Sequence, residues 1–255
     1  MSSQLSRKSG FTLVELAIVL VIVALLSGGL MMTLSAQKEN MAATETQRRL
    51  DEVREALLGY VAANGRLPCP AAPLATGIES PVGGGACTRP RDGLLPGVTL
   101  GLTPTDQNGY VLDGWGNPIR YAVTSYSHAT FCPNGCYSTA NGVRTAWNGS
   151  VGALALAPDL QVCNTATNIQ TPGQLTATCA PNTELATTAV AVIHSRGANG
   201  ARAPSSGDEL ANSDDDRLFV THTPTPPGAN EFDDLVIWLS PNILYNRLIA
   251  AGRLP

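Results

Sequence analysis

The sequence predicts an α+β protein, with a long amino-terminal α-helix packed on an antiparallel β-sheet head whose long loops bear disulfides. Three observations predict this. Residues 11–34 are almost continuously apolar, residues 50–61 repeat apolar side chains at helical spacing, and short apolar segments separated by turn residues follow. A hydrophobic content of 44% in 255 residues excludes a disordered or collagen-like chain. A net charge of −4 argues against a surface built to coat nucleic acid.

The apolar run at residues 11–34 predicts the membrane half of the helix. At ~1.5 Å per residue it spans ~36 Å, enough to cross ~30 Å of hydrocarbon with some tilt. Arg7 and Lys8 precede it, which predicts cytoplasmic residues 1–10 and an outward-facing remainder. A cleaved secretory signal is the alternative, but this run is longer than such signals and contains an acid, Glu15.

Glu15 lies inside the apolar run, where a carboxylate costs roughly 3 kcal/mol, and no lysine or arginine of the run can pair with it. The residues around it read Lys8-Ser9-Gly10-Phe11-Thr12-Leu13-Val14-Glu15-Leu16. This segment resembles the processing site of type IV prepilins and type II secretion pseudopilins. The alternative is a simple membrane anchor that carries a stray acid.

The resemblance implies a leader, residues 1–10, that prepilin peptidase removes after Gly10, followed by methylation of the new amino group of Phe11. It also implies that this amino group meets the Glu15 carboxylate of a neighbouring subunit. The implied partners are the peptidase, other pilin or pseudopilin subunits and an inner-membrane assembly platform. The implied location is the bacterial inner membrane, with a periplasmic head, and then a filament.

Residues 35–63 predict the amphipathic half of the same helix. Leu50, Val53, Leu57 and Val61 recur at steps of three and four, with charged residues between them. No proline interrupts residues 11–63, so one continuous helix is expected. It should end at Asn64-Gly65.

Residues 64–255 predict a β-rich, extracytoplasmic head. Residues 68–104 contain seven of the 18 prolines and should be mostly turns and loops. A serine-proline pair at Ser240 predicts the start of a short closing helix over residues 242–251. The candidate strands are 110–113, 118–124, 151–157, 187–194, 217–222 and 234–239.

Residues 113–121 read Asp113-Gly114-Trp115-Gly116-Asn117-Pro118-Ile119-Arg120-Tyr121, which predicts a tight turn between two strands. The stretch also resembles the D-x-W-G-x-P-x-x-Y segment of the major pseudopilin of type II secretion. This second resemblance lies about a hundred residues from the first and favours the pseudopilins.

The segment 208–234 holds eight of the 20 acidic residues and predicts either a calcium site or a solvated acidic loop. Ser195-Arg196-Gly197-Ala198-Asn199-Gly200, together with Asp233-Asp234, is similar to the calcium loop of major pseudopilins. The implied metal ligands are Asn199, Asp233 and Asp234. That family usually has aspartate where Asn199 stands. No other cofactor is expected.

The cysteines show no C-x-x-C pair, which favours disulfides over a zinc site. Of the fifteen pairings, proximity in sequence suggests three bonds that staple loops: Cys69 with Cys87, Cys132 with Cys136, and Cys163 with Cys179.

No enzyme is expected. The histidines His128, His194 and His222 lack a recognisable catalytic setting, and no G-x-S-x-G elbow occurs. The tryptophans and tyrosines lack interleaved basic residues, so we expect core positions for them. The sequence therefore predicts a structural subunit, minor or specialised, of a type IV pilus or type II secretion pseudopilus. The alternatives are a ligand-binding tip pilin or adhesin, a DNA-uptake pilin, and an anchored hydrolase.

Overall fold

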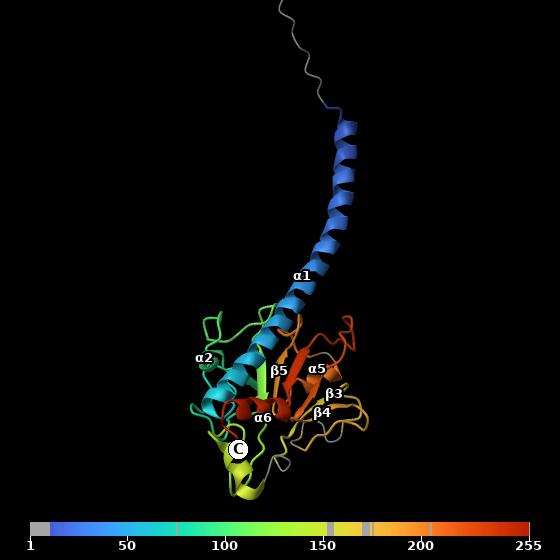
Figure 1. The fold of residues 1–255 in the computed structure, drawn as a ribbon. Helices are drawn as coiled ribbons and strands as arrows, with labels where there is room; N and C mark the ends of the chain where they lie inside the picture. Colours follow the sequence, from blue (N-terminus) through green and yellow to red (C-terminus); the bar gives the residue numbers. More distant parts are fainter. Residues whose placement is uncertain are drawn as a thin grey trace, which may run out of the picture. The chain divides into compact units, whose positions relative to one another are not determined.

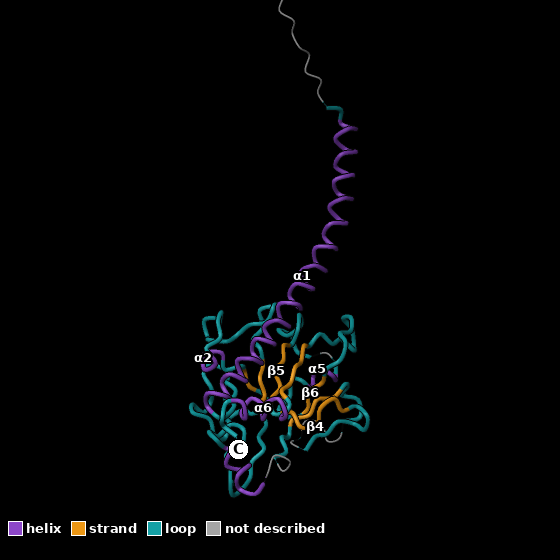
Figure 2. The backbone as a smooth tube through the Cα atoms, viewed as in Figure 1, coloured by secondary structure: helices purple, strands orange, loops and turns teal. Residues whose placement is uncertain are grey.

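The computed structural model describes residues 11–254 apart from 75, 152–155, 170–173, 175 and 205, and for residues 26–36, 150 and 151 it describes the backbone alone. The chain divides into two units, residues 1–41 and residues 42–255. The predicted leader, residues 1–10, lies outside the described residues. Figure 1 shows the fold, and Figure 2 shows that loops surround the sheets.

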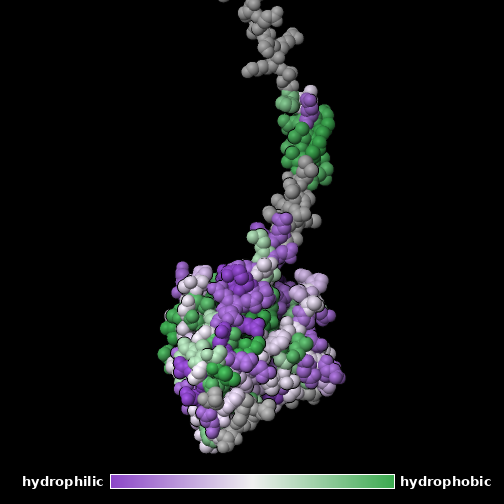
Figure 3. Space-filling view, viewed as in Figure 1, coloured by the Kyte–Doolittle hydropathy of each residue, from purple (hydrophilic) through white to green (hydrophobic). Residues whose placement is uncertain are grey.

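The helix α1 (Leu13–Asn64) belongs to both units and ends within a residue of the position that the sequence predicts. Gly65 follows it with a left-handed backbone, φ 67°, as expected for a helix C-terminus. In the first unit, the described apolar side chains are exposed, including Phe11 and Leu13 (Figure 3). No helix among the described residues has a stretch long and apolar enough to span a membrane. The predicted membrane half overlaps residues 26–36, whose side chains lie outside the description.

In the second unit, the apolar stripe of α1 is buried. Leu50, Val53, Leu57 and Val61 all belong to the main hydrophobic core, together with sheet residues such as Ile193. The apolar side chains that recur at helical spacing in the sequence thus form the buried face of this part of α1. The stripe is continuous because steps of three and four residues return to the same side of a helix.

The first sheet of the second unit has the strand order β1-β2-β5-β7, and all its pairs are antiparallel. Its strands are β1 (Gly93–Leu94), β2 (Arg120–Val123), β5 (Ala191–Ser195) and β7 (Leu235–Leu239). One face contributes to the main core with α1, and the other contributes Ala122, Val192 and Val236 to a second core.

The second sheet has the order β4-β3-β6, formed by β4 (Glu184–Ala189), β3 (Leu160–Cys163) and β6 (Leu218–Val220). Here β3 and β4 are antiparallel, but β3 and β6 are parallel. The predicted all-antiparallel arrangement is thus wrong for this pair. The long connection from β3 to β6 leaves room for the chain to return in the same direction.

The chain passes from one sheet to the other at Val190, between β4 and β5. The Val190 carbonyl oxygen accepts a hydrogen bond from the Thr124 N–H, and the Val190 N–H donates to the Leu239 carbonyl oxygen. The predicted single strand 187–194 is therefore two strands in different sheets. Strand patterning cannot show such a corner, because both segments have strand-like sequences.

Two other strand predictions differ from the structure. Residues 110–113 make only an isolated bridge, from Leu112 to Pro118. Residues 151–157 include residues outside the description, and the five-residue turn of π-helix η1 (Trp147–Val151) precedes them. The strands β1 and β3 were not predicted. The remaining helices are α2 (Gly97–Leu100), α3 (Gly142–Ala146), α5 (Gly207–Ala211) and α6 (Pro241–Ala250).

The closing helix α6 forms as predicted, with the Ser240 hydroxyl accepting from the Ile243 N–H at its start. It lies beside the end of α1 (Figure 1), where Arg247 pairs with Glu55 at 2.9 Å. Beyond α6, the Arg253 guanidinium donates to carbonyl oxygens of the last turn of α1. These bonds satisfy carbonyls that a helix end leaves without partners.

The structure forms all three disulfides that proximity in sequence suggests: Cys69–Cys87, Cys132–Cys136 and Cys163–Cys179. The loop closed by the first bond contains Glu79, which forms a buried ion pair with Arg66. The Arg66 guanidinium donates to both carboxylate oxygens of Glu79, at 2.6 and 2.7 Å. The Cys69 and Gly83 N–H groups donate to the same carboxylate. The predicted loop region is thus irregular in shape but fixed by specific bonds.

Candidate functional site

The described amino-terminal end places Glu15 at the first turn of α1. Thr12 precedes the helix, and its N–H and its hydroxyl each donate to Glu15 Oε2 at 3.1 Å. The Glu15 N–H donates in return to Thr12 Oγ1 at 3.2 Å. This reciprocal arrangement is a capping box, which satisfies N–H groups that the first turn of a helix leaves open. Sequence reasoning missed it, although the spacing of threonine and glutamate is its usual pattern.

The capping box gives the Glu15 carboxylate a partner within its own chain. The residue that the resemblance pairs with it, Phe11, lies directly before the cap and is 85% exposed. Gly10, the other half of the predicted cleavage site, lies outside the described residues. The structure therefore shows Phe11 accessible and Glu15 oriented at a helix start, while the predicted contact between subunits stays a prediction.

In the second unit, the carboxylate of Asp113 organises the tight turn. Asp113 Oδ1 accepts from the N–H groups of Trp115 and Asn117, at 2.9 and 2.8 Å. Asp113 Oδ2 accepts from the hydroxyl of Ser195, at 2.6 Å. Asp113 is buried, so these three donors compensate for the loss of water around its carboxylate.

The same turn holds the loop that follows β5. The Asn117 side-chain amide donates to the Gly197 carbonyl oxygen at 2.8 Å, and the Gly197 N–H donates to Ser195 Oγ at 3.1 Å. The two segments that resemble pseudopilins, residues 113–121 and 195–200, are thus hydrogen-bonded to each other. The turn at residues 113–121 therefore positions the loop at residues 195–200.

The turn also contacts α1 within the second unit. The Gly114 N–H donates to Thr46 Oγ1 at 2.8 Å, and a Cβ at Gly114 would lie 2.2 Å from the Ala42 carbonyl oxygen. The Arg49 guanidinium donates to the Leu112 carbonyl oxygen at 2.5 Å. Glycine is therefore required at position 114, because the backbone of the turn approaches the helix backbone directly.

Beyond this scaffold, three carboxylates meet. Ligand atoms of Glu209, Asp233 and Asp234 all lie within 4.8 Å of one another. Asn199 joins the group: its side-chain amide donates to Glu209 Oε1 at 2.6 Å, and its N–H donates to Asp233 Oδ2 at 3.1 Å. The structure thus brings together the three predicted residues and adds Glu209 from α5.

Burial and mutual repulsion raise the pKa values of two of these carboxyls. Burial is the main cause of the rise at Asp234, whose pKa is about 7, and the charges of Glu209 and Asp233 add to it. The pKa of Asp233 rises to about 6, again mainly through burial. A hydrogen bond of 2.8 Å from Asn212 offsets part of the effect at Asp234. Ionisation of the cluster is therefore unfavourable unless a positive charge is close.

The donor set of this cluster fits a hard cation. Carboxylate oxygens are the ligands that Ca²⁺ prefers. Asp233 Oδ1 is buried and has no hydrogen-bond partner among the described residues. A Cβ at Gly197, whose φ is 58°, would lie 2.2 Å from that oxygen. Glycine at this position lets the loop wrap closely around Asp233.

Comparison with known proteins concerns the other end of the chain. The model of the prokaryotic N-terminal methylation motif matches residues 5–31. This motif marks the type IV pilin and pseudopilin family. Comparisons with curated proteins and with solved structures find no match.

Two of the alternatives considered from the sequence, an anchored hydrolase and a ligand-binding surface of aromatic residues, depend on the positions of the histidines and aromatic residues. His194 is buried in β5. His222 stacks on Phe232 and bonds Asp208 at 3.1 Å, and His128 stacks on Phe131. Among the described residues, no serine hydroxyl hydrogen-bonds a histidine ring. Of the tyrosines, Tyr121 and Tyr137 are fully buried in the core, as expected.

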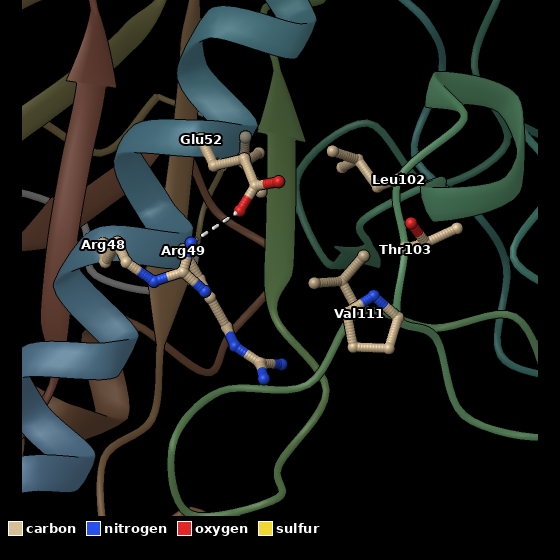
Figure 4. A pocket seen from close by; sticks show the side chains of 8 residues that line it. Arg48, Arg49, Glu52, Leu102, Thr103 and Val111 are labelled. Atoms are coloured by element: carbon tan, nitrogen blue, oxygen red, sulfur yellow. Dashed lines mark hydrogen bonds and ion pairs between the residues drawn. The ribbon is translucent and has the colours of Figure 1, made fainter.

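A small cavity lies between α1 and the loop that follows α2. Figure 4 shows Arg48, Arg49 and Glu52 on the helix side, with Leu102, Thr103 and Val111 opposite them. Its volume of about 20 Å³ is the size of one water molecule. This cavity is a packing gap and offers no space for a ligand.

Glu209 is the site residue that the sequence did not predict. It lies 24 residues before Asp233, on α5, where the Ser206 hydroxyl caps the helix by accepting from the Glu209 N–H at 3.2 Å. The spacing of a serine three residues before a glutamate does predict a helix start here. The contact with Asp233 depends on how the segment folds back, which no local pattern encodes.

Proposed function

We propose that this chain is a minor or specialised subunit of a type IV pilus or of a type II secretion pseudopilus. The methylation motif at residues 5–31 carries this proposal. In it, prepilin peptidase cleaves after Gly10, the amino group of Phe11 is methylated, and residues 11–34 anchor the subunit in the inner membrane with its head in the periplasm.

The exposed apolar side chains of residues 11–25 support assembly through the helix. A surface that is apolar on nearly every side of a helix is unfavourable in water and requires lipid or other helices around it. In the filament, the Phe11 amino group of one subunit neutralises Glu15 of the next and sets the register. The long loops of the second unit favour a specialised role over that of a major subunit.

The experiment measures processing and incorporation. Mass spectrometry of the mature chain should find Phe11 at the amino terminus with the added mass of one methyl group. The variant Glu15→Ala should be processed but lost from sheared filaments. The control Asp51→Ala removes another exposed acid of α1 and should leave incorporation unchanged. A mature chain that begins elsewhere, or normal incorporation of Glu15→Ala, would contradict the proposal.

A ligand-binding role at a filament tip, as an adhesin or in DNA uptake, is the alternative function. Retention of the protein on heparin or DNA at moderate salt would favour the DNA version. Because the net charge of the protein is −4, we expect that heparin or DNA columns do not retain it.

A second proposal concerns the carboxylate cluster: it binds Ca²⁺ through Glu209, Asp233 and Asp234, next to Asn199. The buried and unpartnered Asp233 Oδ1 favours this over a solvated acidic loop. Ca²⁺ should raise the thermal midpoint of the full chain, and a chelator should reverse the rise. Asp234→Asn should lose this response, whereas the control Asp215→Asn, an exposed acid of the same segment, should keep it. An equal midpoint with Ca²⁺ and with chelator would rule out the site.

A further inference from the structure

Strand β7 forms the outer edge of the first sheet. Its only strand partner among the described residues is β5, on one side. The Leu239 carbonyl oxygen accepts a hydrogen bond from the N–H of Val190, the residue directly before β5. The main-chain groups of Leu239 therefore point toward β5. Because successive residues of a strand direct their main-chain groups to opposite sides, Val236 and Trp238 present their N–H and C=O groups outward. No hydrogen bond to these outward groups occurs among the described residues.

The space beside this edge is open. A hollow of about 300 Å³ lies between the edge and the helices α1 and α6, and its lining residues are Arg54, Val236, Ile237, Trp238, Ser240 and Ile243. We call this hollow the edge groove. A second hollow of about 290 Å³ lies between β4 and the residues Trp238, Ser240 and Pro241. Both hollows include Trp238 and Ser240, so together they flank the edge.

The lining of the edge groove is mostly apolar and contains one cation, Arg54 of α1. The Nε of Arg54 is buried and has no hydrogen-bond partner, and no carboxylate of the described residues pairs with the guanidinium. The arginines on either side of it differ: Arg49 bonds Glu45 and Leu112, and Arg247 bonds Glu55. A half-covered guanidinium with open donors binds a carboxylate in a planar, directional manner.

We propose that the edge groove binds an extended peptide segment of a partner protein, which adds a strand to β7 and places a carboxylate on Arg54. The outward main-chain groups of Val236 and Trp238 select an extended backbone, because a helix has no free N–H and C=O groups to pair with them. The side chains of Ile237 and Ile243 favour a peptide that has apolar side chains next to its acidic residue. A nucleic acid is a poor ligand for this groove, because the groove has one cation and the protein has a net charge of −4.

This binding is independent of helix-driven assembly. Arg54, Ile243 and β7 all lie in the second unit, whereas Phe11 and Glu15 lie in the first. A subunit that fails to assemble can still bind the peptide, and an assembled subunit can lack this partner. The proposal of filament assembly and the proposal of peptide binding can therefore be tested, and refuted, independently.

The probe is a short synthetic peptide that alternates threonine and valine and carries one central glutamate. Its control has lysine in place of glutamate. With the full chain in detergent, the glutamate peptide should bind at least about tenfold more tightly than the lysine peptide. The lysine of the control peptide would place a second positive charge next to Arg54, and the two charges repel each other. Equal binding of the two peptides, or none, would overturn the proposal.

Amide hydrogen exchange tests the strand addition directly on the unmodified protein. Saturating glutamate peptide should slow exchange at the Val236 and Trp238 amides. Exchange at the Ile237 amide should stay unchanged, because that group already faces β5. Binding without protection at Val236 and Trp238 would show that the peptide does not add a strand, and would overturn the proposal.

A variant pair tests the role of the cation. Arg54→Gln should weaken the glutamate peptide about tenfold and leave the lysine peptide no weaker. The control is Arg144→Gln, which removes an exposed arginine of α3. If both variants bind the glutamate peptide alike, Arg54 does not receive the carboxylate and the proposal is wrong.

Discussion

The Ser195 hydroxyl donates a hydrogen bond of 2.6 Å to Asp113 Oδ2, across 82 residues of sequence. Both residues are buried, and the bond joins the turn at residues 113–118 to the loop at residues 195–200. The carboxylate cluster lies at the far end of that loop. Its geometry therefore depends on a turn that contributes no ligand to it.

Loss of this bond should destabilise the second unit. Ser195→Ala leaves the buried Asp113 carboxylate with one donor fewer, so the free energy of unfolding should fall by about 1–3 kcal/mol. Urea unfolding of the full chain measures it. Ser127→Ala, which removes an exposed hydroxyl, is the control and should change stability by less than about 0.5 kcal/mol. Equal effects of the two variants would contradict the assigned role.

Gly114→Ala should destabilise the protein by about 1–3 kcal/mol, because the new methyl group would lie 2.2 Å from the Ala42 carbonyl oxygen. Gly59→Ala is a control of opposite sign. Position 59 is on α1 with nothing within 4 Å of its added Cβ, so alanine should stabilise the helix by up to about 1 kcal/mol. Thermal midpoints of both variants, measured side by side, test this pair of expectations.

The two ion pairs Arg66–Glu79 and Arg48–Glu52 should respond differently to removal of the carboxylate charge. The first is buried, so Glu79→Gln should cost about 3–5 kcal/mol by leaving the Arg66 charge uncompensated. The second is exposed, so Glu52→Gln should cost about 0–1 kcal/mol. Chemical denaturation of both variants provides the comparison, and a Glu79→Gln effect as small as that of Glu52→Gln would refute it.

His194 should make stability fall in acid. Burial, followed by the charge of Arg120, lowers the pKa of His194 from 6.5 to about 3. The folded protein thus binds the proton less well than the unfolded chain does. The stabilisation by neutral His194 is complete above pH 6.5 and is lost as pH falls toward 3, with a slope of about 1.4 kcal/mol per pH unit.

The variant His194→Phe removes this titration. Unfolding free energies of the wild type and of the variant, measured between pH 7 and pH 4, should therefore diverge in slope by about that amount. Parallel pH profiles would show that the His194 ring is not held neutral.

The helix and its buried stripe were predictable because periodicity at steps of three and four residues is local. The same holds for the Ser240 cap and for disulfides between cysteines that lie close in sequence. Strand β3 was missed because its partner β6 lies about 55 residues further on and runs parallel to it. Long-range pairing of this kind leaves no mark within the strand itself.

The candidate site shows the same division. Asn199, Asp233 and Asp234 were predicted through a family resemblance, and their proximity depends on two loops, of which Asp113 holds the one at residues 195–200. Glu209 and Arg54 were not predicted, because each acts through neighbours that come from distant elements. A charged residue without a partner in space looks like any other charged residue in a sequence.

Val190 is bonded on both sides, to Thr124 of one neighbouring segment and to Leu239 of the other. Both of these bonds belong to the first sheet, whereas the preceding residue, Ala189, pairs with Leu160 of the second sheet. The two sheets are therefore joined by one continuous, buried piece of backbone, Ala189 and Val190, at a point that water does not reach. We expect the whole second unit to melt in a single step, so that tension on any one strand is shared by both sheets.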